Sequence, residues 1–228
     1  MRKPRRLPVE ALAPFEYVPP LAFATGWGVG PPRAESNEPI PRIDWQELFQ
    51  NANPVEIEVG FGKGLFLITE ATRRPETNFF GIEIIRKYQR YASNRIAARQ
   101  LANCKTCWAD AKRILRDLVP PDSVQTVHVF FPDPWWKTKH KKRTIFTPEF
   151  AAIILGVLKP AGVLHFVTDV SDYFDMVSGV IAAIPQFIPL APPAESAPSH
   201  DMDYLTNFER KFRKEGRPIY RSRHEKRP

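Results

Sequence analysis

The chain has 228 residues, of which 43% are hydrophobic, as expected for a globular protein with one well-buried domain plus extensions. No apolar run approaches the roughly 18 residues of a membrane-spanning helix, and the arginine-rich start lacks the apolar core of a signal peptide, so we expect a soluble, cytoplasmic protein. Lys and Arg exceed Asp and Glu by 33 to 25, a net charge of +8, which favours a polyanionic partner.

The N-terminal part differs in composition from the rest of the chain. Residues 1–43 are rich in proline and carry no sustained helical or strand period, so we predict a loosely ordered extension. A folded domain is expected over residues 44–228. It begins with a short helix, "DWQELFQ", for which Asp44 is the predicted N-cap.

Strand-like and helix-like patterns alternate from Val55 onward. The predicted strands are "VEIEV", "FFGIEII", "CKTCWA", "VQTVHVFF" and "GVLHFVT", and a helical pattern follows each of them. Five βα units in a row predict an α/β fold with a doubly wound, mostly parallel sheet and helices on both faces. Ligands of such sheets bind at the carboxyl ends of the strands. A last strand is expected around residues 219–223, antiparallel at the sheet edge.

The two cysteines form a single C-x-x-C, Cys104 and Cys107, a spacing also found in redox dithiols and in half of a zinc site. They lie in a predicted strand, where residues three apart point to opposite faces. We therefore expect two reduced thiols. No cluster of His, Cys and Asp has the spacing of metal ligands, so no bound metal is predicted.

A glycine-rich turn follows the first long strand. Gly60, Gly62 and Gly64 in "EIEVGFGKG" precede a helix, and glycine there lets the backbone pass close under a ligand. The spacing is not the G-x-G-x-x-G of dinucleotide folds, and Glu58 lies inside the strand. A carboxylate there would repel a pyrophosphate but suits the ammonium and sulfonium of S-adenosylmethionine.

Two more acids end the next two strands. Glu83 stands where doubly wound nucleotide binders place an acid on ribose hydroxyls, although a surface carboxylate is the alternative. Asp110 is placed to reach the adenine amino group. It is also a natural N-cap for the following helix, and both roles are compatible.

The stretch "FFPDPWWKTKHKKR" combines an acid, aromatic residues and a basic run. Asp133 lies between two prolines at the end of a predicted strand, where a target base would arrive. Of Trp135 and Trp136, we expect one to stack on a base and one to fill the core. The basic run over residues 137–143 is either a solvated loop or a phosphate contact, and its position next to Asp133 favours RNA.

The quoted stretches, together with "LHFVTD" and "TNFE", occur in the order and spacing of the tRNA (guanine-N7-)-methyltransferase family. Over residues 55–209 the chain resembles the bacterial single-chain members. The resemblance implies a class I methyltransferase fold, S-adenosylmethionine as the cofactor, and methyl transfer to N7 of a guanine in the variable loop of tRNA. It also implies a cytoplasmic monomer or homodimer with no membrane and no obligate protein partner.

The resemblance also assigns roles to individual residues. The implied cofactor contacts fall on Glu58, Glu83, Asp110 and Asp133. From its own chemistry, Asp133 is also the predicted catalytic residue, because a fixed carboxylate there can hold the guanine N1–H and amino group and stabilise the positive charge that develops on the ring. The implied substrate contacts are Lys137, Asp169 and the turn formed by Thr206, Asn207, Phe208 and Glu209. The implied RNA contacts are Lys139, His140, Lys141, Lys142, Arg143 and Thr144.

Some features depart from the family pattern or leave alternatives. The family often has lysine where Asn207 stands, Trp136 occupies a variable position, and the proline-rich N-terminus has no counterpart. Asp169 is also a candidate cap for the next helix, whereas Glu209 has no evident structural task in a loop. Rival functions are a non-catalytic RNA-binding subunit, disfavoured by the intact acids, and a nicotinamide-dependent oxidoreductase, disfavoured by the glycine spacing.

Overall fold

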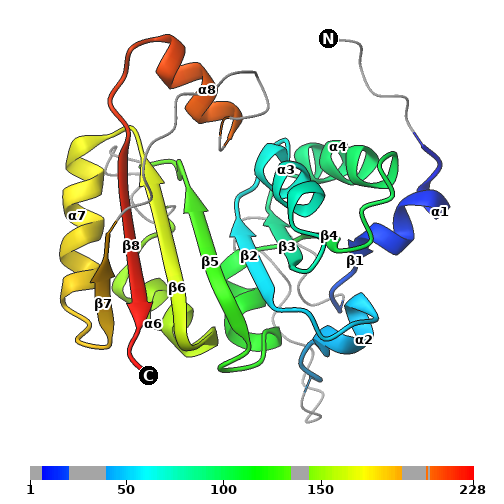
Figure 1. The fold of residues 1–228 in the computed structure, drawn as a ribbon, viewed down its shortest axis with the longest axis horizontal. Helices are drawn as coiled ribbons and strands as arrows, with labels where there is room; N and C mark the ends of the chain where they lie inside the picture. The colour runs from blue at the N-terminus through cyan, green and yellow to red at the C-terminus, as the bar shows by residue number, and fades with distance from the viewer. Residues whose placement is uncertain (1–6, 21–39, 135–143, 192–203, 205) are drawn as a thin grey trace. The chain divides into compact units, whose positions relative to one another are not determined.

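The structure is a computed structural model that describes residues 7–20, 40–134, 144–191, 204 and 206–228 (Figure 1). The chain divides into two compact units, residues 1–120 and 121–228. Within each unit, parallel strands alternate with helices along the chain. In the second unit, the last strand of the chain is antiparallel to both of its neighbours. The predicted α/β class is therefore confirmed.

The first unit contains four parallel strands in the order β1-β4-β3-β2. Every residue of β2 and β3 is buried, as expected for parallel strands covered on both faces. The strands are β1 (Glu16–Tyr17), β2 (Val55–Val59), β3 (Asn78–Glu83) and β4 (Cys104–Trp108). The helices are α2 (Trp45–Phe49), α3 (Leu65–Arg73), α4 (Arg86–Ala97) and α5 (Ala111–Arg113), and a π-helical turn (Ile114–Leu118) follows α5.

Part of the N-terminal segment is folded, which differs from the expected loose order. The helix α1 (Val9–Leu12) and a 3₁₀ turn lead into β1, which pairs with β4. Leu12 and Phe15 are buried, and Gln89 Nε2 donates to Glu16 Oε1 at 2.9 Å. Elements of two to four residues are too short to show a periodicity, so the sequence pattern did not reveal them. The predicted domain boundary at residue 43 stays a prediction.

The second unit has strands in the order β5-β6-β8-β7. Its strands β5 and β6 are parallel, and β8 is antiparallel to both β6 and β7. The strands are β5 (Val124–Phe130), β6 (Leu158–Thr168), β7 (Phe187–Leu190) and β8 (Tyr220–Lys226), and the helices are α6 (Pro148–Val157), α7 (Ser171–Ala182) and α8 (Asn207–Lys214).

The prediction of an antiparallel last strand is confirmed, but its predicted place at the sheet edge is wrong. The strand β7 lies outside β8 (Figure 1). The sequence "FIPL" of β7 has four residues and a proline, so it gave no strand signal. The predicted N-cap of α2 is confirmed, since the Asp44 carboxylate accepts from the N–H of Gln46 at 2.9 Å.

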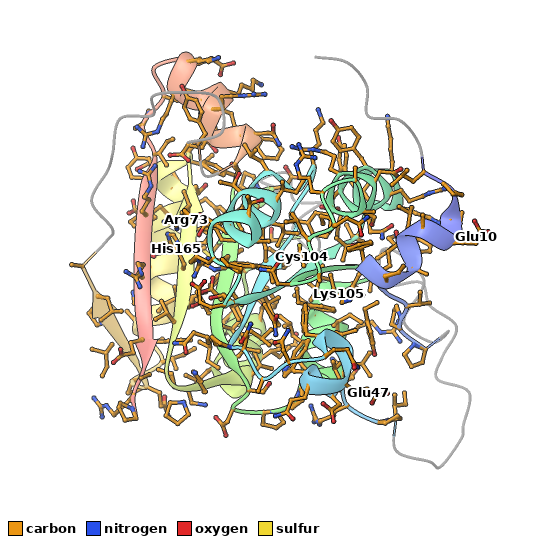
Figure 2. All side chains as sticks on the ribbon, turned by 45° about the vertical axis from the view of Figure 1, so that its right-hand side comes forward. Glu10, Glu47, Arg73, Cys104, Lys105 and His165 are labelled. Carbon is orange, nitrogen blue, oxygen red and sulfur yellow. The ribbon has the colours of Figure 1, made fainter. Side chains whose placement is uncertain are left out.

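Cysteine and histidine side chains are buried in the strands of the two units. Cys104 and Cys107 on β4 are buried free thiols (Figure 2 labels Cys104). His128 on β5 and His165 on β6 are buried neighbours with ring centroids 5.6 Å apart. None of the helices in the described part of the chain has the length and apolar character needed to cross a bilayer.

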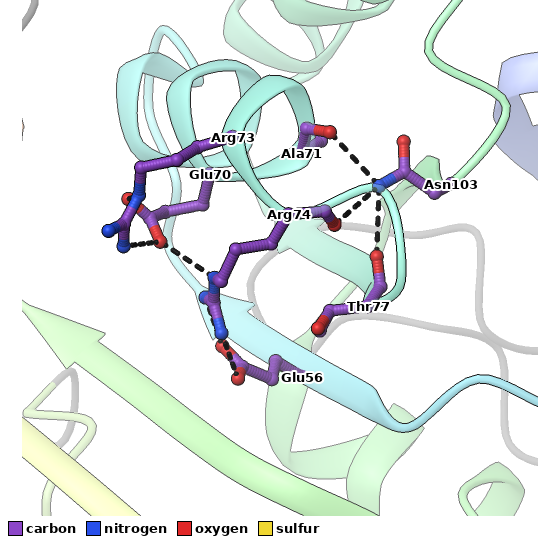
Figure 3. A network of polar contacts seen from close by, with 7 residues as sticks. All are labelled: Glu56, Glu70, Ala71, Arg73, Arg74, Thr77 and Asn103. Atoms are coloured by element: carbon purple, nitrogen blue, oxygen red, sulfur yellow. Dashed lines mark hydrogen bonds and ion pairs between the residues drawn. The ribbon is translucent and has the colours of Figure 1, made fainter.

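An ion-pair network joins the end of α3 to the amino-terminal half of β2 (Figure 3). The guanidinium of Arg74 donates to both carboxylate oxygens of Glu56, at 2.7 and 2.9 Å, and its Nε lies 2.9 Å from Glu70 Oε2. Asn103 Nδ2 donates to three carbonyl oxygens around the helix end, at 2.9 to 3.2 Å. The network fixes one end of the β2–α3 unit, and the glycine turn is at the other.

Candidate functional site

The glycine turn between β2 and α3 has the geometry of a ligand cradle. Gly60 has φ +72°, and a Cβ there would meet no atom of the described residues within 4 Å, so the turn borders open space in that part of the chain. Gly64 has φ +68°, and a Cβ there would lie 2.8 Å from the Cβ of Ala92 on α4. The first glycine therefore leaves room for a ligand, and the last one lets two helices pack closely.

Glu58 on β2 is only 2% exposed. Its Oε2 has no hydrogen-bond partner within the described part of the chain. Burial, and after it the negative charge of Glu83, raise the pKa of the Glu58 carboxyl well above its ordinary value. A buried acid in this state is costly to ionise alone, and an incoming cation would lower that cost.

Glu83 ends β3 and is 5% exposed, so the surface alternative is wrong. Its Oε2 accepts from the N–H of Gly62 and its Oε1 from that of Ile85, both at 2.8 Å. The carboxylate thus ties the glycine turn to the end of β3, a structural role that the sequence did not reveal.

Asp110 is the N-cap of α5, where its Oδ1 accepts from the N–H of Lys112 at 2.9 Å. The capping role is therefore confirmed. Nearby lie side chains outside the sequence motifs. Ile85 is 42% exposed, and the Arg86 guanidinium lies 4.7 Å from the ring centroid of Trp108. An isoleucine two residues after the strand-ending Glu83 was the sequence signal available for this exposed apolar side chain.

In the second unit, the strand β5 leads into Asp133 through an unusual backbone conformation. Phe131 has φ +48°, which is rare for a bulky side chain, and its N–H donates to the carbonyl of Val167 on β6 at 2.7 Å. Asp133 itself is exposed, although partial desolvation by the surrounding protein still raises the pKa of its carboxyl. A strained residue thus places an accessible acid at the end of the strand.

The aromatic and basic residues that follow fall largely outside the described residues. The predictions for Trp135, Trp136, Lys137, Lys139, His140, Lys141, Lys142 and Arg143 therefore stay predictions. The chain on either side is tied together, because the hydroxyl of Thr144 donates to the carbonyl of Pro134 at 3.2 Å. Thr144 thus has a structural contact beside its predicted RNA contact.

Asp169 follows β6, and its side chain is 9% exposed. The alternative that it caps α7 is wrong, because Val170 occupies the N-cap position and makes no side-chain cap. Asp169 forms an ion pair with Arg217 instead. This arginine follows α8 and lies outside the motifs that the sequence shares with the family.

The predicted "TNFE" turn is the first turn of α8. Thr206 is the N-cap, and its hydroxyl accepts from the N–H of Glu209 at 3.0 Å. Glu209 is 4% exposed and pairs with Arg213 at 2.9 Å and Arg221 at 2.6 Å. The expectation that Glu209 lacks a structural task is wrong, because S/T-x-x-E is the sequence signature of a capped helix start.

The same turn keeps two residues toward solvent. Phe208 is 51% exposed, and Asn207 is partly exposed with its Oδ1 3.5 Å from Arg210 Nη2. The ring centroid of Phe208 lies 6.4 Å from that of Phe131. Within the described residues, no group of three or more His, Cys, Asp or Glu side chains is arranged to hold a metal ion.

Comparisons with known proteins relate this chain to methyltransferases. A family described as putative methyltransferase matches residues 52–222. The tRNA (guanine-N(7)-)-methyltransferase of Rhodopirellula baltica is 42% identical over 219 residues, 86% of this chain and 80% of that protein. The protein of the same name from Colwellia psychrerythraea is 37% identical over 178 residues, 78% of this chain and 73% of that protein.

Solved structures show the same fold at lower identity. The 16S rRNA methyltransferase KamB has a TM-score of 0.58 and 16% identity, covering 80% of this chain and 92% of its own. A SAM-dependent methyltransferase from Aquifex aeolicus has a TM-score of 0.52 and 10% identity, covering 78% of this chain and 86% of its own. The sequence relationships, carried on this fold, show that the chain belongs to the tRNA (guanine-N(7)-)-methyltransferase family.

Proposed function

We propose that this chain transfers the methyl group of S-adenosylmethionine to N7 of a guanine in the variable loop of tRNA. The observation that carries the proposal is the 42% identity, over 86% of the chain, to a relative with the corresponding name. The net charge of +8 fits a polyanionic substrate. The enzyme acts in the cytoplasm, as a monomer or homodimer without an obligate protein partner.

The glycine turn and its acids fit the cofactor. The open space at Gly60 admits a ligand next to the backbone. The buried Oε2 of Glu58, which has no hydrogen-bond partner among the described residues, suits the cationic part of the cofactor. Glu83 would accept from the ribose hydroxyls while it holds the turn, and Asp110 would accept from the adenine amino group. When bound, S-adenosylmethionine supplies a methyl group on a positively charged sulfur.

The guanine requires positioning more than proton transfer. Its N7 keeps a lone pair at neutral pH, so no residue has to act as a base, and the geometry of approach controls the rate. Asp133 is exposed and sits at a stiff turn, so its carboxylate can accept from the guanine N1–H and amino group. The same charge stabilises the positive charge that develops on the ring during transfer. The family pattern also gives Asp133 a cofactor contact.

Other residues of the second unit support binding. Asp169 is the second acid proposed to contact the substrate, and Phe208 and Asn207 are the members of the "TNFE" motif that face solvent. Thr206 and Glu209 act on the substrate through the placement of α8, because their polar groups cap and anchor that helix. The basic run over residues 139–143 and Thr144 would contact phosphates of the tRNA.

The test is an incubation of the purified protein with unmodified tRNA and methyl-labelled S-adenosylmethionine, followed by digestion to nucleosides. The expected product is labelled 7-methylguanosine. Label in any other nucleoside, or none, contradicts the proposal. If the protein binds S-adenosylhomocysteine but not NADH, it is not a nicotinamide-dependent oxidoreductase. If it turns over, it is not a non-catalytic RNA-binding subunit.

A further inference from the structure

We infer that Arg217 is a positioning residue for methyl transfer: it orients the Asp169 carboxylate and couples it, through Phe212, to the turn that carries Asp133. The inference rests on the proposed function and concerns residues of the second unit alone. It gives a role to an arginine that lies outside the motifs shared with the family. It also identifies α8 as the element that links the carboxyl ends of β5 and β6.

The position of Arg217 is fixed by the way in which α8 ends. Gly216 has φ +68°, and its N–H donates to the carbonyl oxygen of Arg213 at 3.1 Å. The N–H of Arg217 donates to the carbonyl oxygen of Phe212 at 2.9 Å. These two bonds form a Schellman motif, in which a glycine in the left-handed conformation stops the helix. The chain direction at Arg217 is therefore set by the backbone and does not depend on its ion pair.

The side chain of Arg217 is held on two sides. Its guanidinium pairs with Asp169, whose side chain is 9% exposed, and its Cζ lies 4.3 Å from the ring centroid of Phe212. An arginine that lies over an aromatic face keeps fewer rotamers, and a planar guanidinium restricts the carboxylate that it contacts. The pair thus holds Asp169 in one orientation before a substrate arrives.

Phe212 extends the connection to the turn at the end of β5. Its ring centroid lies 5.5 Å from that of Phe131, the residue with φ +48° two positions before Asp133. Phe212 is 8% exposed and Phe131 is also 8% exposed, so this contact excludes water. A movement of Phe212 would therefore act on the direction in which the chain enters the Asp133 turn.

A purely structural role would give a different result from a positioning role. If Arg217 only stabilised α8, its loss would lower the melting temperature and leave the folded enzyme as fast as before. If Arg217 bound a phosphate, its loss would weaken tRNA binding at an unchanged maximal rate. If Arg217 orients Asp169, its loss should slow the methyl-transfer step even at saturating tRNA and S-adenosylmethionine.

The experiment is a double-mutant cycle measured as the single-turnover rate at saturating substrates, below the melting temperature of every variant. Arg217→Met should lower the rate by about tenfold, equivalent to about 1.4 kcal/mol, and Arg217→Lys should restore part of it. The double variant Asp169→Asn, Arg217→Met should be no slower than Asp169→Asn alone. The arginine acts only by orienting the Asp169 carboxylate, so its loss has no further effect once that carboxylate is gone. Affinity for S-adenosylhomocysteine should stay unchanged.

The matched control is Arg116→Met, which removes an arginine that is also exposed and also paired with a carboxylate, Asp117, in the other unit. Its rate should equal that of the unmodified enzyme. A wild-type rate in Arg217→Met, multiplicative losses in the cycle, or a loss confined to tRNA affinity would each overturn the inference. An unmodified enzyme that forms no 7-methylguanosine would instead refute the proposed function.

Discussion

At the scale of single residues, the acid in the middle of the "PDPW" stretch carries the main chemical prediction. Asp133→Asn keeps the shape of the turn but removes the negative charge and presents an amide donor where an acceptor is needed. One preorganised electrostatic contact stabilises a transition state by about 2.7 to 4 kcal/mol, so the transfer step should slow by on the order of a hundredfold or more. Affinity for tRNA should change far less.

The measurement is a single-turnover rate with S-adenosylmethionine at saturation, because Asp133 also has a proposed cofactor contact. Binding of the cofactor and of tRNA is measured separately on the same variant. A near wild-type rate under these conditions would show that Asp133 is structural, and Asp169 would then become the leading candidate for the charge-stabilising acid.

Glu58 carries a second prediction, on pH. Its pKa is raised in the free protein by burial and by Glu83, so binding of a ligand whose ammonium group pairs with the ionised carboxylate must release a proton. The affinity for S-adenosylhomocysteine should therefore rise with pH, by up to about tenfold per unit below the raised pKa. Calorimetry in two buffers of different ionisation enthalpy measures the proton release.

The same shift affects stability, with the opposite trend in pH. The folded state holds the Glu58 proton more tightly than the unfolded state, whose value is about 4.3. The free energy of unfolding should therefore fall as pH rises from there toward the folded pKa. Glu58→Gln should abolish both the proton release and this fall, and a variant that retains the wild-type proton release would show that another group titrates.

At the scale of elements, the ion-pair network of Figure 3 predicts a change in stability without a change in binding. Arg74 is 27% exposed in its side chain and holds Glu56, which is 8% exposed, through two hydrogen bonds. Arg74→Met should lower the free energy of unfolding by about 1 to 3 kcal/mol, because it takes a charged partner from a buried carboxylate.

The control is Arg73→Met at the next position, whose side chain is 68% exposed and pairs with Glu70. That change should lie within about 0.5 kcal/mol of the unmodified protein. Urea unfolding measures both variants, and their affinity for S-adenosylhomocysteine should match that of the unmodified protein, since the network is remote from the glycine turn along β2. Equal losses in the two variants would contradict the account.

The elements also show what the sequence could and could not predict. Alternating patterns identified the five βα units, because a buried parallel strand and an amphipathic helix each have a clear signature. The strand β7 was not predictable, because a strand of four residues that includes a proline shows no hydrophobic periodicity. The sequence interpretation predicts a loop at the first turn of α8, although Thr206 and Glu209 have the spacing of a capping box.

In the candidate site, residue types were easier to predict than their contacts. Chain order places Glu58 inside one strand, Glu83 at the end of the next and Asp110 after the third, and the structure finds them there. The bond from Gly62 to Glu83 and the pair between Asp169 and Arg217 join residues 21 and 48 positions apart. No local pattern encodes such partners, because the fold as a whole brings them together.

At the scale of the whole molecule, the central claim is the atom that receives the methyl group. The most direct measurement replaces the variable-loop guanine of a synthetic tRNA by 7-deazaguanine, which has carbon in place of N7 and keeps the N1–H and amino edge. With labelled S-adenosylmethionine, the account predicts that this tRNA binds about as tightly as its guanine counterpart and accepts no label, whereas the guanine tRNA yields 7-methylguanosine. Transfer of label to the 7-deazaguanine tRNA at a comparable rate would contradict the account.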